Sequence, residues 1–125
     1  MKELTKAEEQ MMMALWNIEK GYISDIIAAL PEPKPAYTTV STIIKILEKK
    51  GFISHKTHGK NHEYYPLIDK ATYSEKFIKK FAMNYFDNSF TGLVSCFANE
   101  QNLSIIELEE IKQIIENEID KKRNQ

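Results

Sequence analysis

A cluster of small hydroxyl side chains lies at the start of one predicted helix, in residues 36–52, AYTTVSTIIKILEKKGF. The cluster consists of Thr38, Thr39, Ser41 and Thr42. These residue types favour helix caps and strands, so a helix that only filled a core would not need them. Short hydroxyl side chains do let a helix approach a nucleic-acid groove, where they bond bases or phosphates and can place a methyl group against thymine. The chemistry that they indicate is recognition of duplex DNA.

The helical period gives this segment two faces. The predicted core stripe is Val40, Ile43, Ile44 and Leu47. The opposite face carries Thr38, Thr42, Lys45 and Lys49, with Thr39 and Ser41 on its flanks. Lys45 and Lys49 would neutralise DNA phosphates, and Lys56 and Lys60 would do the same from the segment that follows. An ordinary solvated helix face has a similar composition, so the interpretation also depends on the surrounding charge.

The net charge of −1 hides a gradient along the chain. Residues 34–62 contain six lysines, one glutamate and all three histidines, whereas residues 69–125 contain eight basic and ten acidic residues. Such asymmetry indicates a polyanionic partner for the first part of the chain. The second part is not expected to bind an anion.

The histidines His55, His58 and His62 have spacing that raises the question of a metal site. They fall on a predicted hairpin with no thiol and few carboxylates nearby, so we expect no metal and interpret them as exposed residues that can approach phosphate. The sequence contains no recognisable Ser-His-Asp, Cys-His or paired-carboxylate arrangement and no glycine-rich phosphate loop. We therefore expect neither an enzyme nor a bound cofactor.

The first part of the chain reads as three helices followed by a hairpin. Thr5 and Glu8 form a capping-box pattern for a helix over about residues 5–20, and Ser24 is placed to cap a short second helix. Three prolines in residues 31–35 separate it from the third helix, which Thr38 is predicted to cap and Gly51 to end. Two alternating runs around residues 59–61 predict the hairpin. This order is typical of a winged helix-turn-helix domain, here residues 1–68.

The second part, residues 69–125, is predicted to contain three helices. One begins after Asp69 and ends near residue 88, one covers about residues 90–99, and the last begins at a Ser104–Glu107 capping box after a loop at residues 99–102. The fold class is thus mostly α with a small β-hairpin, a winged helix-turn-helix domain followed by an all-α dimerisation domain.

The last helix has apolar residues on two faces, and a unit of this size has a thin core. A second copy would bury the remaining apolar surface, so we expect a symmetric homodimer. The predicted dimerisation residues are Phe77, Phe81, Leu108, Ile111 and Ile115. Alternatively, the aromatic stripe that includes Phe77 and Phe81 lines a small-molecule pocket.

Sequence features also bear on location. No apolar run approaches the ~20 residues of a membrane span, and the start, MKELTKAEEQ, lacks a secretory signal. The single cysteine, Cys96, cannot form an intrachain disulfide. These observations predict a cytoplasmic protein.

Three stretches of the chain, taken together, resemble the penicillinase-repressor family, the winged-helix regulators of beta-lactamase and methicillin-resistance genes. They are LTKAEEQMMMALW, then YTTVSTIIKILEKKGFI with HEYYPL, and finally GLVSCFANEQNLSIIELEEIKQII. The resemblance implies a transcriptional repressor that binds a palindromic double-stranded DNA operator as a homodimer. It carries the family's recognition-helix contacts over to Thr38, Thr39, Ser41 and Thr42.

The resemblance further implies relief by proteolysis, with a membrane-bound sensor metalloprotease as partner and a beta-lactam as signal. The family's cleaved bond aligns with Cys96 and Phe97, where cysteine stands in place of asparagine. Ile46 likewise stands where relatives often have arginine. Two alternatives remain, a winged-helix regulator relieved by a small ligand and a protein-interaction module that does not bind DNA.

Overall fold

The chain folds into two compact units, Met1–Lys76 and Phe77–Gln125. The computed structural model describes residues 2–99 and 102–125, in which six helices and one antiparallel hairpin are formed. This confirms the predicted fold class. The division between the units falls inside a helix, beyond the predicted domain end at residue 68, and the Tyr73 ring, which packs against Trp16 and Phe52, belongs to the first unit.

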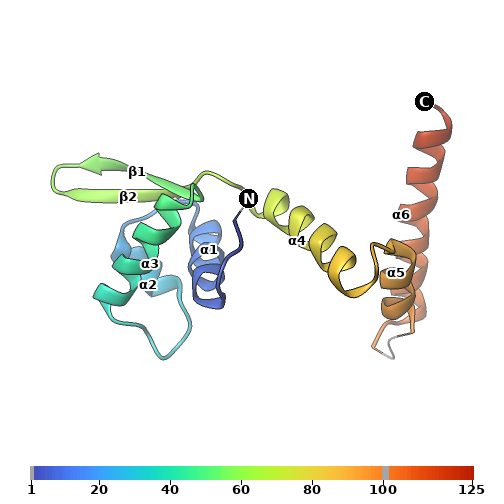
Figure 1. Cartoon of the computed structure of the whole chain (residues 1–125), viewed down its shortest axis with the longest axis horizontal. Helices are drawn as coiled ribbons and strands as arrows, with labels where there is room; N and C mark the ends of the chain where they lie inside the picture. The colour runs from blue at the N-terminus through green and yellow to red at the C-terminus, as the bar shows by residue number, and fades with distance from the viewer. Residues whose placement is uncertain (1, 100–101) are drawn as a thin grey trace. The chain divides into compact units, whose positions relative to one another are not determined.

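The first unit contains α1 (Lys6–Ile18), α2 (Ile23–Ala29), α3 (Tyr37–Lys49), β1 (Ile53–His58), β2 (Asn61–Pro66) and the first turns of α4 (Lys70–Tyr85). The hairpin extends away from the three helices that precede it (Figure 1). The predicted capping box of α1 is confirmed, because Thr5 Oγ1 accepts from the Glu8 N–H and Glu8 Oε1 accepts from the Thr5 N–H.

Two predicted helix caps were wrong. Ser24 lies inside α2, which begins after Tyr22 because the Asp25 carboxylate accepts from the Tyr22 N–H at 2.9 Å. Thr38 lies in the first turn of α3, which has Ala36 at its N-cap, and the Val40 N–H donates to the Ala36 carbonyl oxygen at 3.1 Å. The helix that carries the hydroxyl cluster therefore starts earlier than predicted, and Thr38 becomes a side chain on its surface.

One hydrophobic core joins every element of this unit up to β2. Its least exposed large side chains are Met12, Leu15, Ile26, Val40, Ile44, Leu47, Phe52 and Ile53. Trp16 packs at the edge of this core and donates from Nε1 to the Ile68 carbonyl oxygen at 2.8 Å. This bond anchors the chain between β2 and α4 to α1.

The hairpin is held to the helices at two points. Gly21 and Tyr64 exchange backbone hydrogen bonds of 3.0 and 2.8 Å, which adds a short bridge beside β2. A Cβ atom at Gly21 would lie 2.8 Å from Asp25 Cβ, so glycine is required where the chain passes close to α2 beside this bridge. At the other point, the Leu67 N–H donates to the Phe52 carbonyl oxygen at 2.8 Å. The wing is thereby positioned beside α3.

The second unit contains the end of α4, α5 (Phe90–Ala98) and α6 (Ile105–Arg123). The capping box of Ser104 with Glu107 is confirmed. At the start of α4, in the first unit, Asp69 Oδ1 accepts from the Thr72 N–H as predicted. The predicted loop at residues 99–102 lies partly outside the described residues. None of the helices in the described part of the chain is long and apolar enough to cross a membrane.

Candidate nucleic-acid interface

The outward face of α3 is the surface that the sequence predicts to meet DNA. Val40, Ile44 and Leu47 are buried in the core, as the helical period requires. The outward face, defined as the remaining predicted contact residues of α3, consists of Thr38, Thr39, Ser41, Thr42, Lys45 and Lys49. All of these are exposed except Ser41, which is half-buried. The structure thus brings the predicted hydroxyls and two predicted lysines onto one surface.

Local hydrogen bonds determine what this face can offer a ligand. Thr42 Oγ1 donates to the Thr38 carbonyl oxygen at 2.9 Å, so the Thr42 hydroxyl can accept but not donate while that bond persists. Among the described residues, no side chain caps α3 at Ala36. The N–H groups of its first turn can therefore bind an acceptor such as a phosphate oxygen.

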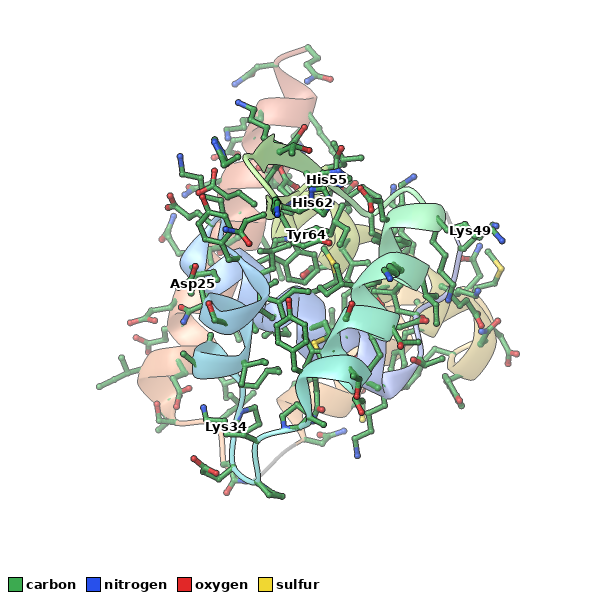
Figure 2. The ribbon with its side chains drawn as sticks, turned by 90° about the vertical axis from the view of Figure 1, so that its left-hand side faces the viewer. Asp25, Lys34, Lys49, His55, His62 and Tyr64 are labelled. Carbon is green, nitrogen blue, oxygen red and sulfur yellow. The ribbon has the colours of Figure 1, made fainter. Side chains whose placement is uncertain are left out.

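Four predicted phosphate-binding lysines, Lys45, Lys49, Lys56 and Lys60, are exposed, the first two on α3 and the others on the hairpin. None of the four forms an ion pair with another residue in the described part of the chain. Figure 2 shows Lys49 at the edge of the unit, apart from the hairpin histidines. These ammonium groups can neutralise an external anion without first breaking an internal contact.

The other two lysines of the positive window are used inside the fold. Lys50 forms an ion pair with Glu8 at 2.6 Å, and Lys34 Nζ donates to the Ala28 and Leu30 carbonyl oxygens at the end of α2. The ion pair with Glu8 neutralises Lys50, whereas Lys34 is exposed and keeps its charge, because its acceptors are uncharged carbonyl oxygens. The local excess of positive charge is therefore smaller by one lysine than a count along the sequence gives.

Of the three wing histidines, His58 and His62 are exposed as predicted, whereas His55 is half-buried. His55 Nδ1 lies 2.5 Å from Glu48 Oε2 of α3, and its ring centroid lies 4.2 Å from that of His62. His55, His62 and Tyr64 form one group in Figure 2. Burial and the Glu48 carboxylate raise the pKa of Tyr64, which keeps that phenol neutral. The interpretation of His55 as an exposed wing residue was wrong, because Glu48 engages it and so ties the wing to α3.

Sequence reasoning did not assign a role to Tyr37, the first residue of α3. It is 60% exposed and lines a cavity of about 330 Å³ together with Tyr22, Lys60 and Tyr64. Its only sequence signal was its position beside the hydroxyl cluster. Tyr37 therefore adds an exposed aromatic side chain at the start of α3, on the side that faces the hairpin residue Lys60.

The site has an exposed face of hydroxyls and lysines on α3, a reverse side packed in the core, and a basic wing. Comparisons with known proteins agree with this arrangement. Residues 4–117 match the family model described as Penicillinase repressor. The chain belongs to the penicillinase repressor family. This membership confirms the transcriptional-repressor function that the resemblance implied.

The repressor is similar over nearly its whole length to named relatives. Methicillin resistance regulatory protein MecI of Staphylococcus aureus strain N315 is 31% identical over 114 residues, which cover 90% of this chain and 93% of MecI. The Penicillinase repressor of Bacillus licheniformis is 25% identical over 122 residues, which cover 97% of this chain and 95% of that protein. Both are similar in length to this chain, so the similarity includes both units.

Among solved structures of similar fold is that of Bordetella bronchiseptica BpsR, whose DNA binding is regulated by 6-hydroxynicotinic acid. It aligns with a TM-score of 0.52 at 17% identity and covers 95% of this chain and 77% of the BpsR chain. At this identity the likeness concerns the fold alone.

The residues predicted for dimerisation and cleavage lie in the second unit and are largely accessible. Phe77 is 50% exposed, Ile111 37% and Ile115 44%, while Phe81 and Leu108 are half-buried. Cys96 and Phe97 are both exposed and lie within α5. Only Ala82 and Leu93 are buried among the described residues of this unit, and α6 buries none.

Proposed function

We propose that this repressor binds a palindromic duplex operator as a homodimer, with α3 of each copy in the major groove of one half-site. The observation that carries the proposal is the outward face of α3, where exposed hydroxyls and lysines lie opposite a buried apolar stripe. A helix with this construction can insert one side into a groove while its other side stays packed. Short threonine side chains keep its backbone close to the base edges.

The wing supplies contacts beside the groove. Lys56 lies on β1 and Lys60 in the turn of the hairpin, and the pair between Glu48 and His55 connects β1 to α3. With α3 in the major groove, these two lysines are available for the neighbouring phosphates. Such contacts position the protein and add affinity without reading the base sequence.

A second copy of the chain is the proposed partner of the second unit. Its helices expose large apolar side chains, including Phe77, Ile111 and Ile115, and they bury few residues of their own. Phe81 and Leu108 adjoin this surface as half-buried side chains. A twofold interface would bury these residues and pair two recognition helices with two half-sites.

Relief of repression is proposed to follow cleavage between Cys96 and Phe97 by a membrane-bound sensor metalloprotease that responds to a beta-lactam. The exposure of both residues supports access. Because the bond lies within α5, that helix must open locally before a protease can bind the chain. The repressor itself is proposed to be cytoplasmic, where it meets its operator and the inner side of such a sensor.

The salt dependence of DNA binding tests the proposal. A duplex enriched from a random pool by the wild-type protein serves as the probe, and its dissociation constant is measured by fluorescence anisotropy from low to moderate salt. Each lysine that contacts a phosphate contributes about 0.9 to the slope of log affinity against log salt. Replacing Lys49 with alanine should therefore lower the slope of a dimer by roughly two.

Lys112→Ala is the matched control, because Lys112 is an exposed lysine of α6 that pairs only loosely with Glu116, at 3.9 Å. It should leave the slope unchanged. Failure to enrich any duplex, or binding that does not respond to salt, would contradict the proposed function.

A further inference from the structure

One isoleucine of α3 is left outside the core. Ile44 is buried and Ile43 is half-buried, but Ile46 is 41% exposed. It therefore presents a large apolar side chain on a helix whose exposed residues are otherwise mostly hydroxyl-bearing or charged. The core does not require this side chain to be apolar.

Ile46 continues a row of methyl-bearing residues. Thr39, Thr42 and Ile46 are spaced three and four residues apart, which places them next to one another along one side of a helix. We call these three residues the methyl row. Thr42 donates its hydroxyl hydrogen to the Thr38 carbonyl oxygen, so what it can add to the row is its methyl group. Ile46 has no polar atom in its side chain at all.

Two cationic residues lie along one side of the methyl row. At about 100° per residue, Lys45 and Lys49 both fall on the same side of Ile46 around the helix. If these two ammonium groups hold the phosphates along one border of a groove, the row beside them faces into the groove. This step rests on the proposed function, which places α3 in the major groove.

The floor of the major groove offers one apolar group to such a row, the C5-methyl of thymine. A lysine or hydroxyl residue gains little from that methyl, whereas an exposed isoleucine loses water-contacting surface when it packs against it. We propose that Ile46, together with the methyl group of Thr42, packs against a thymine C5-methyl in each half-site and makes Ile46 a specificity-determining residue.

The expected effect is set by the burial of one methyl group. Burying one such group contributes about fourfold in affinity. A palindromic site contains the contact twice, so loss of both thymine methyls should lower the affinity of a dimer for the duplex by about fifteenfold. Replacing thymine with deoxyuridine removes the methyl and leaves every hydrogen-bonding group of the base in place.

The experiment uses the full-length protein and a duplex that it enriches from a random pool. Deoxyuridine replaces thymine at one symmetric pair of positions at a time, and the dissociation constant is measured for each duplex. At one of these pairs of positions, wild-type protein should bind the deoxyuridine duplex about fifteenfold more weakly than the thymine duplex. Ile46→Ala should reduce this ratio to roughly threefold or less, because it removes most of the side chain that meets the methyl.

Met13→Ala is the matched control, since Met13 is a similarly exposed apolar residue, at 49%, on α1 of the same unit. It should keep the wild-type ratio. Thermal melting followed by Trp16 fluorescence establishes that both variants are folded. Equal binding of thymine and deoxyuridine duplexes at every position overturns the inference, and so does an unchanged ratio in Ile46→Ala. Failure of the wild-type protein to enrich any duplex is a different result, which overturns the proposed function itself.

Discussion

The ion pair between Glu8 and Lys50 joins the start of α1 to the end of α3 and yields a quantitative prediction. Glu8 is 5% exposed, and its Oε1 accepts from Lys50 Nζ at 2.6 Å and from the Thr5 N–H at 2.9 Å. Burial by itself would raise the pKa of Glu8, but the bonds from Lys50 and Thr5 outweigh it and lower that pKa. Glu8 is therefore charged at neutral pH inside the unit that carries the recognition helix.

Lys50→Met removes the cation and keeps a side chain of similar length. Breaking a buried ion pair by deleting one partner costs about 3–5 kcal/mol. The Thr5 N–H still bonds the carboxylate, and the Lys50 side chain is 22% exposed, so water can reach the site. We expect a loss near 2–3 kcal/mol in the free energy of unfolding, which is below the range for a fully enclosed pair.

The double variant Glu8→Gln with Lys50→Met should be less destabilised than Lys50→Met, by about 1 kcal/mol, because the uncompensated charge is gone. Urea denaturation followed by Trp16 fluorescence measures the free energy of unfolding of both variants, since Trp16 is the single tryptophan and lies in the first unit. Lys56→Met, which removes an exposed wing lysine, should stay within about 0.5 kcal/mol of wild type.

The pH dependence has a defined sign. A carboxyl group whose pKa is lowered by folding stabilises the native state above its unfolded pKa, and that contribution disappears as pH falls through its native pKa. The difference between wild type and Lys50→Met should therefore be largest near neutral pH and shrink in acid. A loss below 1 kcal/mol at pH 7, or a difference that does not change with pH, would refute this account of the pair.

Two further substitutions test the proposed interfaces. Thr42→Glu places a negative charge on the outward face of α3 and should abolish duplex binding in a gel-shift assay without unfolding the protein, because Thr42 is exposed; retained affinity would remove it from the interface. Leu108→Asp places a charge beside the apolar surface of α6 and should yield monomers in sedimentation experiments; an intact dimer would show that α6 packs elsewhere.

Local sequence patterns were sufficient to predict most of the helices and the hairpin. The capping boxes at Thr5 and Ser104 work through side chains and N–H groups three residues apart, so their start positions followed from sequence. The caps predicted at Ser24 and Thr38 failed where competing local contacts began the helix earlier. A serine or threonine is equally compatible with a cap and with a first turn, and backbone geometry decides between them.

The sequence predicted which side of α3 is exposed, but it did not predict which charged side chains are paired inside the protein. The period of α3 separated Val40 and Ile44 from Thr42 and Lys49, because successive side chains of a helix are rotated by about 100° around its axis. The partner of Lys50 could not be predicted, since Glu8 is 42 residues away in the chain and the two meet only when α1 packs on α3. The partner of His55 could not be predicted either, because Glu48 meets it only when the wing folds back beside α3.

By itself, the sequence determined the order of helices and hairpin, the two-sided character of α3 and the family resemblance, because each depends on residue types at short spacing. Only the tertiary structure decided which lysines stay available to DNA, that Glu48 holds the wing through His55, and that Ile46 lies outside the core. The physical reason is that burial and pairing are properties of neighbours in space. The chain brings those neighbours together only when α1, α3 and the hairpin pack on one core.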